Sequence, residues 1–233
     1  MPPLLAIILA LTGCVLADDF GQSVNDAIQG FRQKSASQRD GTSVPPVAGQ
    51  PLGATKSVKV EDESWVDIPE KLPGAIFVGM RDHQFASPAA GKKFLTTAGV
   101  DGCIAVLLVD PNSPQTGLFH FHWADPKETD AVLVKAFPKG QQAPTGSVAI
   151  VLGGYPLSAT DSPASAKSTA MSQYIQDQFK KLGAKVQILE KNHLTPYVRN
   201  VYFDMDKSVL YVQSVGGGKE GETRNDRYRI KRE

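Results

Sequence analysis

Cysteine, net charge and long apolar runs are all scarce in this chain of 233 residues. Its only cysteines are Cys14 and Cys103, and Cys14 lies in an apolar N-terminal segment. The rest of the chain therefore has one thiol and no internal disulfide to close. The net charge of +1 offers no basic footprint for nucleic acid. No stretch of about 18 apolar residues occurs, so the sequence predicts no transmembrane helix.

The composition favours a single folded domain with extensions at both ends. Hydrophobic residues make up 41% of the chain and charged residues 21%, which suits one core of about 150 residues. The pattern predicts a signal sequence at 1–17, then a short helix and a flexible Ser-, Gly- and Pro-rich linker at 18–60. The folded domain is expected at 61–214, and residues 215–233 are expected to form a disordered tail.

The N-terminal segment allows two routes of export. Val15-Leu16-Ala17 before Asp18 fits an ordinary signal peptidase site. Leu11-Thr12-Gly13-Cys14 resembles the bacterial lipobox, in which the cysteine is diacylated and becomes the new N-terminus. We therefore expect a secreted protein or a periplasmic or outer-envelope lipoprotein. The protein would contact a membrane only through a lipid anchor at Cys14.

The distribution of apolar residues predicts strands and helices in alternation. Asp125-Pro126 is typical of a helix start, and Gly183 of a helix end. The predicted strands are 75–80, 102–109, 117–123, 148–152, 185–189, 198–203 and 209–212, and the predicted helices are 126–136 and 165–182. We expect an α/β fold, a layered sandwich of mixed β-sheet with flanking helices.

Cys103, His120 and Thr97 form the most informative constellation. Cys103 follows Gly102 at a turn before a continuous apolar strand, and His120 lies 17 residues later on the partner strand of a hairpin. If the two lie roughly opposite, their Cβ atoms are about 4.5–5.5 Å apart. An imidazole at that distance can take the thiol proton, and the Thr97 hydroxyl can orient the ring. Backbone N–H groups at Gly102 and Cys103 can stabilise an oxyanion.

Other interpretations of these residues stay open at this point. Cys103 is alternatively a buried structural thiol. His122 competes with His120 for the role of base, because strand residues two apart share a face. The two histidines also form a His-X-His pair, although no third metal ligand is evident. Trp123 is expected to pack or to line a substrate cleft. Gly153-Gly154 lacks the remainder of a phosphate-binding loop, so nucleotide binding is not predicted.

The order of these residues resembles a known family. Thr97, Cys103, an apolar strand and Gly117-Leu118-Phe119-His120 follow one another as in the CheD glutamine deamidases and the related cytotoxic-necrotizing-factor-type toxins. Later segments keep the family's order: 148–154, a helix from Ser165, 186–188, 199–204 and 209–212. The resemblance extends over residues 94–213, about half the chain. It implies a CheD-like fold with Cys103 as nucleophile, His120 as base and Thr97 as its partner.

Two positions beside the cysteine depart from this family pattern. Gly102 stands where CheD proteins usually have Ser or Thr, and Asp101 precedes it. Val100-Asp101-Gly102-Cys103 is therefore more similar to the Leu-Ser-Gly-Cys of the toxins, with Asp in place of Ser. A carboxylate so close to the thiol is expected to raise the pKa of Cys103.

The resemblance implies an exported cysteine hydrolase that deamidates protein glutamine side chains to glutamate. Such an enzyme needs no cofactor or metal, and its partner is a protein that carries a reactive glutamine. A monomer with an effector-like or toxin-like role is expected. The alternatives are a cysteine peptidase or transglutaminase, and a non-catalytic tethered binding domain on a deamidase scaffold. The separation of 17 residues between Cys103 and His120 disfavours papain-like enzymes, and Asp101 favours the binding domain.

Overall fold

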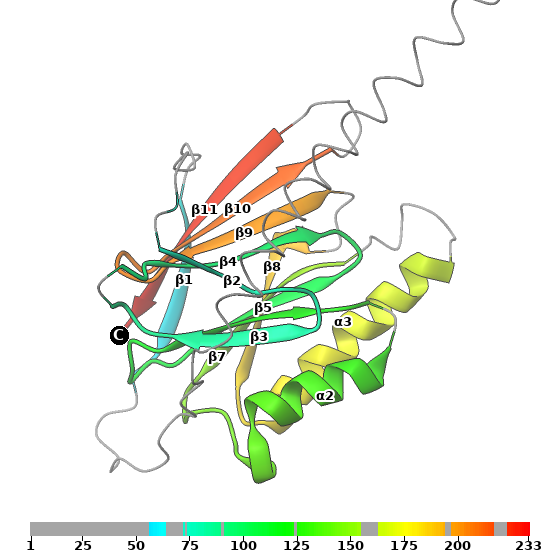
Figure 1. Ribbon diagram of the computed structural model, residues 1–233, viewed down its shortest axis with the longest axis horizontal. Coiled ribbons are helices and arrows are strands. Elements are labelled where there is room, and N and C mark those ends of the chain that lie inside the picture. The colour runs from blue at the N-terminus through cyan, green and yellow to red at the C-terminus, as the bar shows by residue number, and fades with distance from the viewer. Residues whose placement is uncertain are drawn as a thin grey trace, which may run out of the picture. The chain divides into compact units, whose positions relative to one another are not determined.

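The computed structural model describes residues 56–63, 72, 74–89, 91–123, 125–154, 163–193, 197–216 and 223–233 (Figure 1). The predicted signal sequence 1–17, its Cys14, and the predicted helix and linker as far as residue 55 lie outside these residues. The linker prediction is wrong at its C-terminal end, because a strand begins at Val58. No helix among the described residues is long and apolar enough to cross a membrane.

The described strands form two mixed β-sheets (Figure 1). The six-stranded sheet has the order β1-β11-β10-β9-β4-β2, and the five-stranded sheet has the order β3-β6-β5-β7-β8. The pairs β2 with β4 and β7 with β8 are parallel, and the other pairs are antiparallel. The strands are β1 Val58–Glu63, β2 Ala75–Phe77, β3 Asp82–Ala86, β4 Phe94–Val100, β5 Ile104–Val109, β6 Thr116–Phe121, β7 Val148–Gly153, β8 Lys185–His193, β9 Val198–Asp204, β10 Val209–Val215 and β11 Thr223–Arg232.

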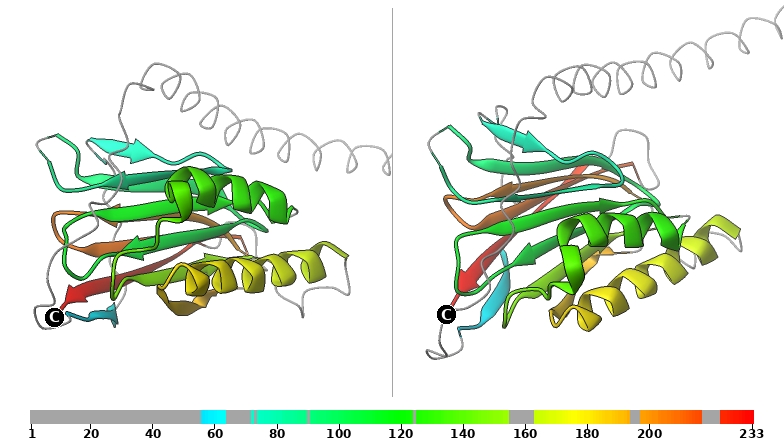
Figure 2. Two further views of the ribbon diagram at one scale, coloured as in Figure 1. Left: turned by 90° about the horizontal axis from the view of Figure 1, so that it is seen from below. Right: turned by 60° about the horizontal axis from the view of Figure 1, so that its bottom comes forward.

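Two helices, α2 (Pro126–Ala136) and α3 (Pro163–Lys181), cover one face of the five-stranded sheet (Figure 2). A short 3₁₀ turn, η1 (Pro138–Gly140), follows α2. Asp125 caps α2, since its side chain accepts a hydrogen bond of 2.8 Å from the Lys127 N–H. The two sheets and the helices make three layers. The predicted α/β layered sandwich of mixed sheet is confirmed, and the described helices flank it on one side.

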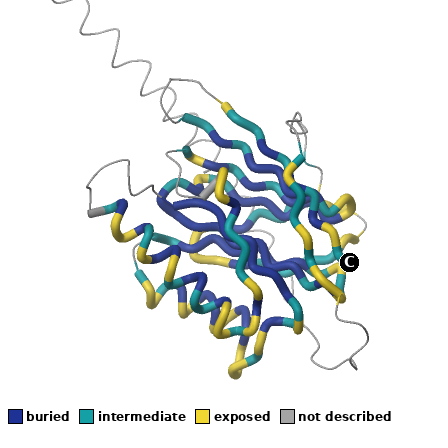
Figure 3. The backbone as a smooth tube through the Cα atoms, turned by 180° about the vertical axis from the view of Figure 1, so that it is seen from behind, coloured by how far each residue is buried: buried dark blue, intermediate teal, exposed yellow. Residues whose placement is uncertain are grey.

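One apolar core lies between the two sheets, and a second lies between the five-stranded sheet and the helices. The strands are buried along much of their length, as the tube in Figure 3 shows. Residues of β5 alternate between these two cores: Ala105, Leu107 and Val109 face the six-stranded sheet, whereas Ile104 and Val106 face the helices. This explains why β5 is apolar throughout, because both of its faces are covered.

The C-terminal region corrects the prediction of a disordered tail at 215–233. Residues 223–232 form β11, which pairs with both β1 and β10. Tyr228 and Ile230 of this strand lie in the core between the sheets. The neighbouring charges are matched across the pair: Arg227 and Arg229 each lie 2.6 Å from Glu63. Composition suggested disorder because the partner strand that neutralises these charges is far away in sequence.

Candidate active site

The hairpin of β5 and β6 sets the relative positions of Cys103 and His120. Val109 pairs with Thr116 and Ala105 pairs with His120. Cys103 precedes Ala105 by two residues, so it lies diagonally from His120, and the expectation that the two lie opposite is corrected. The loop between the strands, 110–115, is centred one residue later than expected. Each residue of β5 is therefore paired with a β6 residue two positions away from the expected one. Diagonal neighbours on a sheet are still about 7–8 Å apart at their Cα atoms.

Thr97 and His120 are in direct contact across the two sheets. Thr97 Oγ1 lies 2.7 Å from His120 Nδ1 and donates a hydrogen bond of 2.8 Å to the Val78 carbonyl oxygen. A threonine hydroxyl has one proton, so the contact with His120 requires the hydroxyl to accept from Nδ1–H. His120 is thereby held as the Nδ1–H tautomer. Its Nε2 has no hydrogen-bond partner among the described residues and is the atom left to act as base.

A β-bulge in β4 brings Thr97 to this position. Thr97 pairs with Val201 of β9, but Val100 pairs with Arg199, so one extra residue is accommodated between them. Gly99 supplies the positive φ of 71° that this irregularity needs. β4 is not among the strands predicted from the sequence. Its run Phe94-Leu95-Thr96-Thr97 is rich in residues that favour strands, and this signal could have revealed it.

The turn before Cys103 is held by hydrogen bonds to four successive carbonyl groups. Arg199 Nη1 donates to the Val100 oxygen at 3.2 Å, and Ser168 Oγ donates to the Gly102 oxygen at 2.9 Å. The Gly154 N–H lies 3.2 Å from the Asp101 oxygen and 2.9 Å from the Cys103 oxygen. Three distant segments thus immobilise the backbone that carries the thiol, and local sequence offers no sign of Ser168 in this role.

Gly153 and Gly154 both support the cysteine turn, Gly153 because it has no side chain and Gly154 through its N–H. Gly153 has a φ of +100°, and a Cβ atom there would lie 2.5 Å from the Cys103 carbonyl oxygen. Only glycine allows β7 to end so close to this turn. The Gly-Gly pair therefore has a clear backbone function in this structure, in support of the turn.

The thiol of Cys103 is buried and covered by a methionine. Cys103 is 7% exposed, and its Sγ lies 3.7 Å from the Sδ of Met80, a residue that is itself 45% exposed. Burial raises the pKa of Cys103 to about 11, opposed by a backbone hydrogen bond from Trp123; the charge of Asp101 raises it further. The expected effect of Asp101 has the right sign, but burial is the larger cause.

Arg199 lies fully buried on β9 and is electrostatically attracted to Asp101. Burial nevertheless lowers the pKa of Arg199 to about 10, so it is still protonated at neutral pH. This guanidinium donates to the Val100 carbonyl oxygen, and its positive charge is stabilised by the charge of Asp101. The attraction between the two charges explains how Asp101 is tolerated in this turn, next to the buried residues Gly102 and Cys103.

His120 is neutral at physiological pH. It is 3% exposed, and burial, with a smaller contribution from His122, lowers its pKa to about 4. The Cys103 thiol is also neutral under these conditions, and no hydrogen bond joins it to His120. The structure therefore shows a resting pair of thiol and imidazole instead of a thiolate–imidazolium ion pair. Such a pair can react by general-base catalysis, in which the proton moves as sulfur attacks.

His122 lies just beyond the end of β6, where strand alternation no longer applies. Its Nδ1 is 3.2 Å from Glu128 Oε2 in the first turn of α2, and the same carboxylate oxygen lies 2.7 Å from Arg81 Nε. His122 thus has a carboxylate neighbour on the helix layer, whereas His120 has Thr97 on the other sheet. Trp123 follows, half-buried, with its ring centroid 5.7 Å from that of His122.

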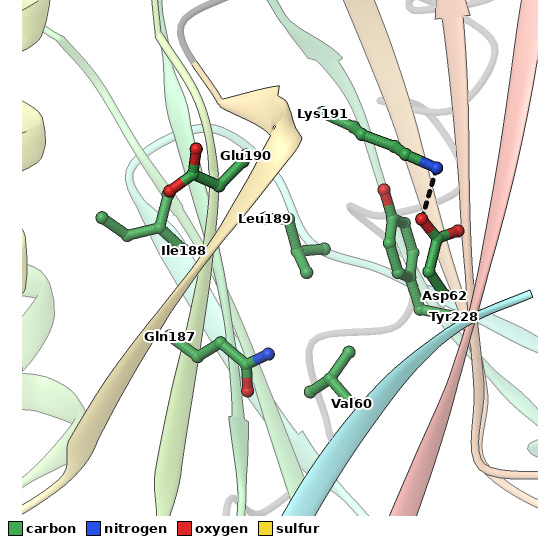
Figure 4. A pocket seen from close by; sticks show the side chains of 8 residues that line it. All are labelled: Val60, Asp62, Gln187, Ile188, Leu189, Glu190, Lys191 and Tyr228. Carbon is green, nitrogen blue, oxygen red and sulfur yellow. Dashed lines mark ion pairs between the residues drawn. The ribbon is translucent and has the colours of Figure 1, made fainter.

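Other sites that could hold a ligand lie away from this cluster. No group of three or more His, Cys, Asp or Glu side chains that could bind a metal occurs among the described residues. A hollow lies between β8 and the β1–β11 edge, where Lys191 and Asp62 form an ion pair (Figure 4). Its lining residues are Val60, Asp62, Gln187, Ile188, Leu189, Glu190, Lys191 and Tyr228, and none of them is a predicted site residue.

Models of known protein families do not match this chain, and curated protein sequences also give no match.

Proposed function

We propose that this protein is a cysteine amidohydrolase that deamidates glutamine side chains of a protein substrate. The single observation that carries the proposal is the arrangement of His120. Its Nδ1–H is engaged by Thr97, and its Nε2 has no hydrogen-bond partner in the part of the chain that the structure describes. His120 lies on β6, next to β5, the strand that Cys103 directly precedes. A buried imidazole with one nitrogen oriented and the other unoccupied is the requirement for a general base beside a nucleophile. The CheD-like order of Thr97, Cys103 and His120 supports the same reaction.

Acylation begins when Cys103 sulfur attacks the carboxamide carbon of glutamine. The thiol proton passes to His120 Nε2, and the carbonyl oxygen becomes an oxyanion in a tetrahedral intermediate. The oxyanion collapses, the carbon–nitrogen bond breaks, and His120 returns the proton to the departing ammonia. The product of this half-reaction is a thioester between Cys103 and the former side chain.

Deacylation uses the same groups with water in place of the thiol. His120 Nε2 takes a proton from water as its oxygen attacks the thioester carbon. The second tetrahedral intermediate then releases Cys103, which recovers its proton from His120, and glutamate remains on the substrate. Thr97 keeps the ring plane and tautomer constant through both halves, because its contact is with Nδ1.

The thiol must be uncovered before it can react. In the resting structure Sγ contacts Met80, and a rotation of the Cys103 side chain toward His120 would separate the two sulfur atoms. Met80 has three flexible side-chain torsions and is substantially exposed, so it can move aside when a narrow glutamine side chain enters. We include export in the proposal, as a secreted protein or a lipoprotein acylated at Cys14.

The test is incubation of candidate protein substrates with the native chain and with Cys103→Ser. We expect the mass gain that accompanies replacement of a glutamine NH₂ by OH with the native protein alone. Equal gains with both proteins would exclude Cys103 as the nucleophile. His120→Ala should also abolish the gain, and His122→Ala is its matched control. Loss with the His122 variant and retention with the His120 variant would instead assign the base to His122.

A second candidate function is a non-catalytic tethered binding domain. The covered thiol, with its pKa near 11 and no hydrogen bond to His120, is the observation that favours it. Acylation of Cys103 by p-nitrophenyl acetate at pH 7 separates the two functions. A catalytic pair loses most of this rate in His120→Ala, whereas an inert thiol reacts equally slowly in both proteins. Addition of a primary amine tests the transglutaminase alternative, which predicts incorporation of the amine into the substrate.

A further inference from the structure

The hydrogen bonds around the cysteine turn also determine where its N–H groups point. A trans peptide is planar, and the C=O of one residue points opposite to the N–H of the next. The Gly102 carbonyl is held by Ser168, so the Cys103 N–H points away from Ser168. The Asp101 carbonyl is held by the Gly154 N–H, so the Gly102 N–H points away from Gly154.

The positions of Ser168 and Gly154 in the fold show toward which sheet and which strand each N–H group points. Ser168 belongs to α3, on the helix side of the five-stranded sheet, so the Cys103 N–H points toward the six-stranded sheet. Gly154 follows β7, which flanks β5 on the side opposite β6, so the Gly102 N–H points toward β6. The next peptide follows the same rule. The Cys103 carbonyl oxygen points toward Gly154, and Ile104, whose N–H points the opposite way, pairs with Phe121 of β6.

One N–H group therefore points toward β6 and the other toward the six-stranded sheet. His120 lies in both directions, because it belongs to β6 and contacts the six-stranded sheet through Thr97. In the described part of the chain, neither the Gly102 N–H nor the Cys103 N–H donates a hydrogen bond to another residue. Two convergent donors beside a nucleophile and its base form the arrangement that stabilises an oxyanion.

We propose that the N–H groups of Gly102 and Cys103 form the oxyanion hole and that Ser168 is a positioning residue, which aims the Cys103 N–H by holding the Gly102 carbonyl. This inference rests on the acyl chemistry of the proposed function but does not need glutamine as the substrate. Removal of the Ser168 hydroxyl would free the peptide between residues 102 and 103 to rotate, and the oxyanion would lose an aligned donor.

The experiment compares two reactions of the same thiol. p-Nitrophenyl acetate acylates Cys103 through an oxyanion: sulfur bonds to the acetyl carbon, p-nitrophenolate leaves, and the thiol proton passes to His120. Iodoacetamide alkylates Cys103 with loss of iodide and without an oxyanion. The ratio of the two rates therefore reports the oxyanion hole, whatever the pKa or accessibility of the thiol.

Ser168→Ala should lower the ratio of acylation to alkylation about 10-fold, less than the complete loss of a donor, which costs about 10²–10³-fold. Ser172→Ala is the matched control. Ser172 is also buried, one turn along α3, and its Oγ accepts a hydrogen bond of 3.2 Å from Gln176 Nε2. This variant should keep the native ratio, and Ser168→Thr, which retains a hydroxyl, should recover most of it.

A ratio in Ser168→Ala that matches the one in Ser172→Ala would overturn the positioning role. An equal fall in both reactions of Ser168→Ala would also overturn it, because the thiol itself would then be what changed. The proposed function fails separately, when the native chain deamidates no glutamine and His120→Ala leaves acylation unaltered. In that case the ratio of acylation to alkylation in Ser168→Ala still decides whether Ser168 positions the Cys103 N–H.

Discussion

Replacement of Thr97 by valine tests the central contact of the site. The two side chains have nearly the same shape, so Thr97→Val removes a hydroxyl from a fully buried position without leaving a cavity. It removes two hydrogen bonds at once, the one to the Val78 carbonyl and the one from His120 Nδ1. Each buried partner left without a hydrogen bond costs about 1–3 kcal/mol. We expect the free energy of unfolding to fall by about 2–6 kcal/mol.

The same substitution should alter the protonation of His120. In the native protein at pH 7, ¹⁵N NMR should show a neutral ring with its proton on Nδ1. In Thr97→Val neither ring nitrogen has a protein acceptor, so the two tautomers should mix and the fraction with an unprotonated Nε2 should fall. Acylation of Cys103 by p-nitrophenyl acetate should slow in proportion to the loss of this oriented base, within the roughly 10²–10⁴-fold that such a base contributes.

Thr97→Ser is the control, because it keeps the hydroxyl and loses one methyl group. It should retain the Nδ1–H tautomer and lose about 0.5–1.5 kcal/mol of stability. Urea denaturation measures the two costs. A proton found on Nε2 in the native protein would refute the argument, and so would a Thr97→Val protein as stable and as reactive as Thr97→Ser.

Three further predictions test the surroundings of the site. Gly153→Ala places a Cβ against the Cys103 carbonyl oxygen and should lower the free energy of unfolding by about 2–4 kcal/mol. Gly99→Ala, at a similar positive φ but in open space, should lower it by about 1–2 kcal/mol. Equal losses in urea denaturation would contradict the crowding at Gly153. Deletion of residues 223–233 removes a strand that pairs on both sides, so the near-ultraviolet circular dichroism and the cooperative thermal transition should be lost; a native-like melting curve would show that β11 is dispensable. The pKa of His120 lies at about 4 in the folded protein and about 6.5 in the unfolded chain, so unfolding takes up a proton between these values. Stability should therefore fall by about 3 kcal/mol as the pH drops from 6.5 to 4. Calorimetry of His120→Gln should show a smaller loss, and an unchanged pH dependence would contradict the lowered pKa.

The predictions that depended on neighbours in sequence are largely confirmed. The hairpin of β5 and β6, the capped start of α2 and the α3 helix all lie close to their expected ranges. Turn residues and apolar periodicity are local properties, so they are visible without a structure. The exact cross-strand partner of Cys103 was missed by two residues, because a shift of one residue in the turn centre changes every partner by two.

The errors share a different cause. The prediction of a tail at 215–233 failed because the charges of β11 are neutralised by β1, more than 150 residues earlier. The support of the cysteine turn by Ser168 escaped notice for the same reason, since a serine on an amphipathic helix is an ordinary residue until the chain folds.

The amino-acid sequence by itself determined both described helices, seven of the eleven described strands and the set of reactive side chains, because strand patterns, turn residues and the solitary thiol are properties of short segments. The tertiary structure alone decided which nitrogen of His120 is free, why the Cys103 thiol stays protonated, and which groups hold its backbone. These properties depend on burial and on hydrogen bonds between distant segments, and both arise only when the two sheets and the helices pack together.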